Sequence, residues 1–202
     1  PHEIKEMKKG EQHGKHIIYW PNGEMMLKSF YQDGKLEGSF EGWHADASSS
    51  FVRNYVNGIA VGDEVQYYSK EEAEDHYTSR IKQTLHYDHA GKLDGKQQTF
   101  YSSGQLQSEE KYQHGSLHGQ MISFTDDGEM VHEANYQKGD LEGKFFHKDA
   151  AGRVIECSYV KNKKNGQYTI YHTLDEMYRK QIALSAFYEI GVLEKETVTY
   201  NE

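Results

Sequence analysis

Residues 112–124 read YQHGSLHGQMISF and carry the pattern that decides the fold. A tyrosine stands three residues before a glycine, a second glycine follows four residues later, and a polar and apolar stretch then ends on an aromatic residue. Glycine adopts positive φ at no steric cost, so the glycine pair indicates a tight turn between two extended segments. The stretch therefore predicts the end of one β-strand, a turn and the following strand.

The same pattern recurs along the whole chain, which makes it a repeat. Glycine pairs with this spacing occur at 10–14, 34–38, 58–62, 91–95, 115–119 and 139–143, with degenerate copies at 162–166 and 191–195. The units begin near residues 7, 31, 55, 87, 112, 136, 159 and 188, and insertions fall near 69–80 and 173–180. We therefore predict that residues 1–202 form a single repeat domain.

Each unit has the composition of a β-hairpin. The residue five positions after the second glycine is aromatic in six of seven units. Turn sequences such as Pro21-Asn22-Gly23 and Asp126-Asp127-Gly128 then reverse the chain. Because each hairpin contacts mainly its neighbours, the sequence predicts an all-β fold, a single elongated antiparallel β-meander of about eight repeated hairpins.

The Y-x-x-G-x-L-x-G frame, the aromatic residue five positions later and the N-G turn resemble the bacterial variant of the MORN repeat over residues 7–200. Many proteins with this repeat are described as antitoxins or immunity proteins, others are scaffolds, and some have been proposed to bind phospholipids. The resemblance implies a binding protein and supplies no catalytic residues. The chain departs from the frame at Asn162 to Gly166, at Lys148 and in the two insertions.

Composition narrows the classes of partner. The 202 residues are 36% apolar and 13% aromatic, and 23 Lys and Arg against 32 Asp and Glu give a net charge of −9. This charge disfavours binding of nucleic acid or anionic lipid and favours a basic partner. No run approaches the length of a membrane-spanning helix, so we expect no transmembrane segment. The one cysteine, Cys157, excludes an intrachain disulfide and is predicted to be a structural thiol.

The sequence contains none of the G-x-S-x-G, P-loop, H-E-x-x-H or G-x-G-x-x-G motifs. His13 and His118 stand just before the second glycine of their units, where other units have Glu37, Asp94 and Glu142. This equivalence favours a row of polar turn residues over a set of metal ligands. We therefore predict no catalytic residues, no metal site and no cofactor, and that the chain is not an enzyme.

Two features are candidate partner-binding elements. The first is the row of aromatic residues Trp43, Tyr67, Phe100 and Phe124. These side chains either pack within the sheet or form a partly open face that contacts a protein. The second is the acidic run containing Glu71, Glu72, Glu74 and Asp75. It is either solvated charge or an acidic finger that docks onto a basic partner.

These observations predict a non-enzymatic protein-binding repeat module. The resemblance makes an immunity or antitoxin protein, which neutralises a cognate and basic toxin by direct binding, the most concrete hypothesis. Two alternatives stay open: a scaffold that self-associates as a homo-oligomer or organises partners, and a phospholipid-binding module. The compartment also stays open. The cytoplasm is slightly favoured, and the periplasm would follow if a signal peptide had been removed.

Overall fold

A computed structural model describes residues 2–73, 80–172 and 181–198. Contacts divide the chain into two compact units, Pro1–Leu106 and Gln107–Glu202. Each unit is described by itself, and the single repeat domain stays a prediction. The predicted insertion at 173–180 lies outside the described residues, as do residues 74–79 of the insertion at 69–80.

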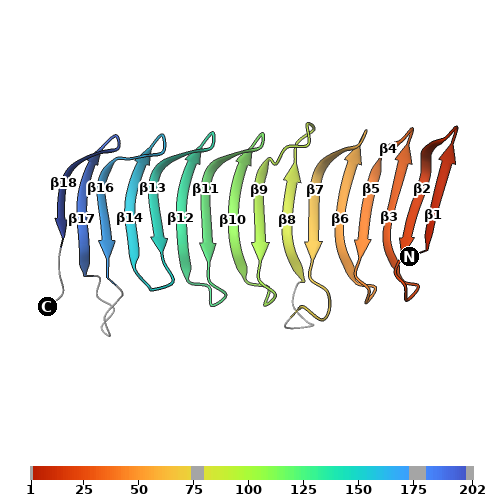
Figure 1. Ribbon diagram of the computed structural model, residues 1–202, viewed down its shortest axis with the longest axis horizontal. Helices are drawn as coiled ribbons and strands as arrows, with labels where there is room; N and C mark the ends of the chain where they lie inside the picture. The colour runs from red at the N-terminus through yellow and green to blue at the C-terminus, as the bar shows by residue number, and fades with distance from the viewer. Residues whose placement is uncertain (1, 74–79, 173–180, 199–202) are drawn as a thin grey trace. The chain divides into compact units, whose positions relative to one another are not determined.

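Unit 1 is an antiparallel meander, drawn from red to yellow-green in Figure 1. Each strand pairs with the strand before it, and β4 and β5 both pair with β3. Its strands are β1 (Glu3–Lys8), β2 (Glu11–Tyr19), β3 (Met25–Gln32), β4 (Lys35–Leu36), β5 (Gly38–Trp43), β6 (Ser49–Val56), β7 (Ile59–Tyr67), β8 (Ile81–Tyr87) and β9 (Gly95–Phe100).

Unit 2 repeats the arrangement. Its strands are β10 (Leu106–Gln113), β11 (Ser116–Phe124), β12 (Met130–Gln137), β13 (Asp140–Lys148), β14 (Val154–Val160), β15 (Lys163–Lys164), β16 (Gly166–Tyr171), β17 (Ile182–Glu189) and β18 (Val192–Val198). The strands again pair antiparallel in chain order, and β15 and β16 both pair with β14. The predicted fold class, an all-β antiparallel meander of repeated hairpins, is therefore confirmed within each unit. The described residues include no helix that is long and apolar enough to cross a membrane.

In six units, the second glycine lies opposite the tyrosine near the end of the next return strand. The pairs in register are Gly14 and Tyr31, Gly38 and Tyr55, Gly62 and Tyr87, Gly119 and Tyr136, Gly143 and Tyr159, and Gly166 and Tyr188. These glycines have positive φ, for example +84° at Gly143. The register of β12 on β13 shifts beside Gly143, so this conformation accompanies a β-bulge.

The tyrosines pack on the residue two positions after the second glycine. Ring centroids lie 5.7 Å apart for Phe40 and Tyr55 and 5.5 Å apart for Phe145 and Tyr159, both edge-to-face. Most of the buried side chains in the strands lie on this face of the sheet: Ser29, Glu64, Gln97, Ala134, Cys157 and Ala186. The thin core therefore forms on the face that carries the residues two positions after the second glycine, and the buried position of Cys157 agrees with a structural thiol.

Hydrogen bonds between successive turns join the repeats. Glu37 Oε2 accepts from the backbone N–H of Asn57 at 2.8 Å, and Glu142 Oε2 accepts from that of Lys161 at 3.0 Å. His118 Nδ1 likewise accepts from the backbone N–H of Lys138 at 3.4 Å. The residue before the second glycine is thus an acceptor that satisfies a backbone donor of the next turn. This arrangement explains why both histidine and glutamate occur at that position.

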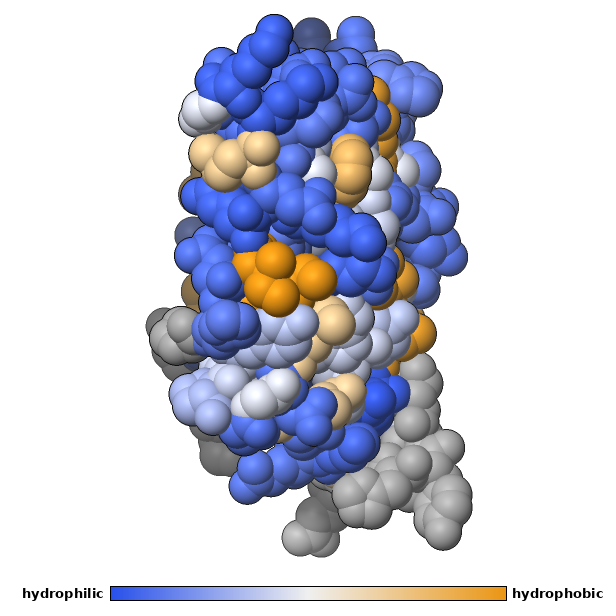
Figure 2. All heavy atoms as spheres, turned by 90° about the vertical axis from the view of Figure 1, so that its right-hand side faces the viewer, coloured by the Kyte–Doolittle hydropathy of each residue, from blue (hydrophilic) through white to orange (hydrophobic). Residues whose placement is uncertain are grey.

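The side of unit 1 at which β1 lies is mainly hydrophilic. Figure 2 views the side on which β1 lies in Figure 1, where blue side chains predominate and hydrophobic ones form small patches. The large apolar residues exposed on β1 are Ile4 and Met7. Isolated exposed side chains of this kind are ordinary on protein surfaces and indicate no binding site.

Gly38 tests whether the repeat needs glycine for conformation or for space. Its φ is +73°, yet an added Cβ atom would meet nothing within 4 Å. We expect Gly38→Ala to lower the free energy of unfolding by about 1–2 kcal/mol, and Gly38→Asn to cost less, because asparagine tolerates the left-handed region better. Urea unfolding followed by tryptophan fluorescence measures this in unit 1, which holds both tryptophans, Trp20 and Trp43. Equal losses for the two variants would contradict the conformational explanation.

Candidate binding surface in unit 1

A cavity of about 390 Å³ opens on unit 1 between strands β5 to β8 and the connection that follows β7. Aromatic rings and charged side chains both contribute to its walls. The lining residues are Phe40, His44, Ser50, Phe51, Arg53, Glu64, Gln66, Tyr67, Glu72 and Lys82. Gly42 makes room for one wall, because a Cβ atom there would lie 2.3 Å from the Phe51 ring.

A buried ion pair contributes to the lining of the cavity. The Arg53 Nε and Nη2 atoms each donate to one oxygen of Glu64 at 2.6 Å, and Gln66 Nε2 adds a third hydrogen bond at 2.7 Å. The Glu64 side chain is only 1% exposed, whereas that of Arg53 is 28% exposed. A buried carboxylate is costly unless it is paired and hydrogen-bonded, and the bidentate geometry meets that requirement.

The surroundings keep Glu64 ionised. Burial alone would raise the pKa of its carboxyl, but the hydrogen bonds from Arg53 and Gln66 outweigh burial and lower the pKa below its ordinary value. The Arg53 guanidinium also lies near the rings of Tyr55 and Tyr87, at 6.0 and 5.9 Å from their centroids. Burial and the Glu64 charge together raise the pKa of the Tyr87 hydroxyl. The cavity therefore contains a neutralised ion pair beside aromatic rings.

The acidic connection after β7 begins as a defined turn beside the cavity. Ser69 N–H donates to Glu72 Oε2 at 2.9 Å, and Glu72 N–H donates to Ser69 Oγ at 3.2 Å, which is the reciprocal pattern of a capping box. The hydrogen bonds from Ser69 lower the pKa of the Glu72 carboxyl, which therefore stays charged. Lys70 N–H donates to Asp46 Oδ2 at 2.9 Å and fixes the connection to the turn between β5 and β6.

The structure brings two of the predicted site residues together. Tyr67, from the aromatic row, and Glu72, from the acidic run, line the same cavity, and Glu71 is exposed beside Glu72. The aromatic residues Trp43, Tyr67 and Phe100 of unit 1 and Phe124 of unit 2 are all half-buried where β5, β7, β9 and β11 end. Glu74 and Asp75 lie outside the described residues. Whether any of the eight contacts a partner stays a prediction.

Sequence reasoning did not single out Arg53, Glu64 or His44. The available signal was Glu64 itself, a carboxylate at the position where other units place Phe40, Gln97 and Met121. The hairpin pattern places Arg53 opposite Phe40, and the register confirms this pairing. Its ion pair with Glu64 forms across the bulge between β6 and β7, which the repeat spacing does not reveal.

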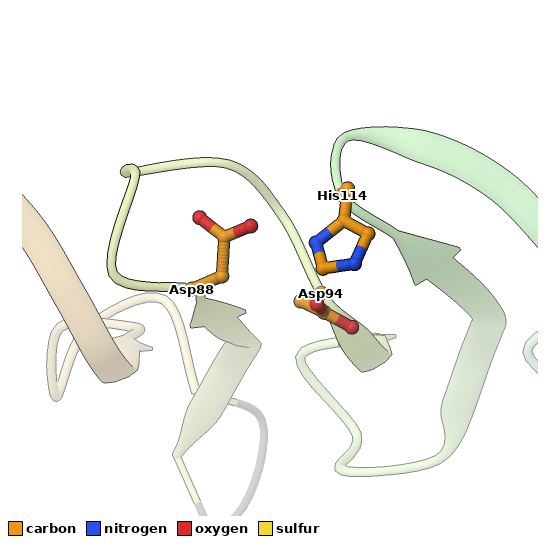
Figure 3. Close-up of side chains that lie close together, drawn as sticks. All are labelled: Asp88, Asp94 and His114. Carbon is orange, nitrogen blue, oxygen red and sulfur yellow. The ribbon is translucent and has the colours of Figure 1, made fainter.

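The next connection of unit 1, between β8 and β9, also carries carboxylates, Asp88 and Asp94 (Figure 3). Asp88 Oδ1 accepts from the backbone N–H groups of Ala90 and Lys92 at 2.9 and 3.0 Å. Asp94 stands before the second glycine of its unit, where Glu37 joins neighbouring turns. The bonds of Asp88 stabilise the turn, as aspartate does in many turns.

Fold and sequence together define a protein built from β-hairpin repeats with a glycine-based turn. The family model described as the MORN repeat variant matches residues 12–33 and 93–114. The resemblance is thus confirmed for these two segments. No curated protein matches the chain. Repeats of this family are generally modules that bind proteins or membranes and are not typically enzymes.

Removal of the Arg53 guanidinium should destabilise unit 1. Arg53→Met leaves the Glu64 carboxylate buried without its partner, so we expect the free energy of unfolding to fall by about 3–5 kcal/mol. The double variant Arg53→Met, Glu64→Met should recover most of this loss, because no uncompensated charge is left. Urea unfolding followed by tryptophan fluorescence gives both values. A double variant as unstable as Arg53→Met would contradict this explanation.

Acid should weaken unit 1 through Glu64. The pKa of Glu64 is held below its ordinary value of 4.5, so near that pH the folded state binds fewer protons than the unfolded state. The stability from this carboxylate is complete above pH 4.5 and is lost as the pH falls through the lowered pKa. We expect Glu64→Gln to flatten the dependence of unfolding free energy on pH in that range. Glu24→Gln, at an exposed turn position, is the matched control and should keep the wild-type slope.

Proposed function

We propose that this chain is a non-enzymatic protein-binding module, and specifically an immunity or antitoxin protein that neutralises a cognate toxin by direct binding. One observation carries the proposal. Tyr67 and Glu72, which come from two separate predicted features, line a single cavity together with the rings of Phe40 and Phe51. Aromatic pockets beside charged groups are typical places for the anchor residues of protein interfaces.

The charges of the surface favour a basic partner. Arg53 is matched by Glu64 inside the cavity, and Lys82 lies close enough to Glu72 to help lower the pKa of its carboxyl, after the larger effect of the Ser69 hydrogen bonds. Glu71 adds an exposed carboxylate, and the whole chain has a net charge of −9. Such charge accelerates encounter with a cationic protein surface and contributes to selectivity.

The first test identifies the partner and its activity. The chain is used as bait in its native source, and each captured protein is then expressed alone in a growth assay. We expect one stoichiometric partner that inhibits growth when expressed alone and is neutralised when the chain is co-expressed. A partner without toxicity would refute the immunity function but leave a protein-binding function standing. Self-association without any partner would support the scaffold alternative, and retention on anionic vesicles at physiological salt would support phospholipid binding.

Two variants then locate the interface. Glu71→Lys reverses an exposed charge, so we expect it to weaken binding of the purified partner about tenfold, mainly through slower association at low salt. Tyr67→Ser removes a cavity wall and should weaken binding by at least about 2 kcal/mol, mainly through faster dissociation. Biolayer interferometry separates the two rates.

The matched control is Glu24→Lys, the same charge reversal on the exposed turn between β2 and β3. It should leave the affinity within a factor of about two, since a distant exposed charge is screened by salt. Circular dichroism establishes that each variant is folded before binding is measured. Equal effects of Glu71→Lys and Glu24→Lys would place the interface elsewhere.

A further inference from the structure

Unit 2 places two histidines next to each other on paired strands in the middle of its sheet. His132 on β12 and His147 on β13 are direct partners in the register of the two strands. Their ring centroids lie 5.7 Å apart, with the planes inclined at 70°. Ser123 on β11 and Ile155 on β14 continue the row on either side, and both histidines are half-buried.

Among the residues that the structure describes, neither imidazole makes a hydrogen bond. Other histidines differ in this respect, because hydrogen bonds engage the rings of His13, His16, His44, His86 and His118. The nitrogen atoms of this pair are therefore not engaged by protein groups of the described residues, and the acceptor nitrogen of a neutral imidazole is a metal ligand.

The surroundings hold the His132 ring in place and favour its neutral form. Phe145 packs against that ring edge-to-face, with centroids 5.2 Å apart. Burial, with a smaller effect of the neighbouring His147, lowers the pKa of His132. Neutral imidazole is the form that binds zinc, copper and nickel ions.

We propose that His132 and His147 form a two-histidine site for a divalent transition-metal ion, with water completing the coordination shell. Metal–nitrogen distances of about 2.0 Å allow one ion to bridge rings at the observed separation. The ligands come from two adjacent strands, so the site exists only when β12 and β13 are paired. Binding therefore stabilises the folded state of unit 2. The site is separate from the partner surface proposed for unit 1.

The probe is Zn²⁺, added to the metal-free full chain. Isothermal titration calorimetry should show one ion bound per chain at the strongest site, and long-range ¹H–¹⁵N spectra should show shifts of the His132 and His147 ring nitrogens. We expect His132→Gln and His147→Gln each to weaken this binding by about tenfold or more, since each removes one of two protein ligands. Zn²⁺ should raise the melting temperature of the wild type but not of either variant.

Two further variants separate the metal site from other effects. The chain has 12 histidines, so His89→Gln, which removes an exposed histidine of unit 1, is the matched control and should keep wild-type affinity. His132→Phe keeps an aromatic ring against Phe145 while removing the ligand atoms, and it should fold but not bind. Unchanged affinity in the folded His132→Phe variant overturns the proposal. Where a variant fails to fold, ring-nitrogen signals of wild-type His132 and His147 that do not move with Zn²⁺ overturn it equally.

Discussion

The left-handed backbone at the second glycine of each repeat is the constraint on which the rest of the structure depends. At Gly38 and Gly143 φ is +73° and +84°, and an added Cβ atom would meet nothing within 4 Å. At these two positions glycine is therefore required for its conformation and not for its small size. This conformation interrupts the regular ladder, as between β4 and β5, and sets a tyrosine opposite the glycine. The repeated pairing of glycine and tyrosine then fixes the register of every following hairpin.

A single sheet built in this way has a thin core, and this affects which side chains its strands can accommodate. The apolar side chains that are buried among the described residues are Ala73, Ala134, Val154, Cys157 and Ala186. With so few large apolar contacts, stability comes in good part from the antiparallel ladders, the tyrosine packing and the hydrogen bonds between turns, such as that from Asn57 to Glu37. Such a fold tolerates polar residues in the centre of a strand when they find partners, as Arg53 and Glu64 do.

The sequence predicted the repeat, the hairpins and the fold class, because the glycine pair and the tyrosine act locally. It also predicted both features that meet at the unit 1 cavity, Tyr67 and Glu72. It did not predict which face of the sheet is more buried. Alternation along a strand assigns side chains to two faces but does not tell which of the two is more buried. Nor did it predict the Arg53–Glu64 pair, because that contact forms across a bulge. The histidine pair of unit 2 requires the register of β12 on β13, which spacing alone does not give.

Turns and strand centres thus have different roles in this chain. The turn residues of the repeat must adopt positive φ or supply a side-chain acceptor for a backbone N–H of the next turn. They are therefore similar among the units whatever the function. The residues at the strand centres on the buried face vary among units. The two departures described above are the ion pair beside the cavity of unit 1 and the two imidazoles of unit 2. The repeat therefore determines where side chains are displayed, and the residues at the strand centres determine what they bind. Under the proposed function, Tyr67 supplies contact area that the repeat pattern shares among units, whereas selectivity for a partner of unit 1 comes from Glu72 and from Arg53 and Glu64, whose positions the other units fill with other residues.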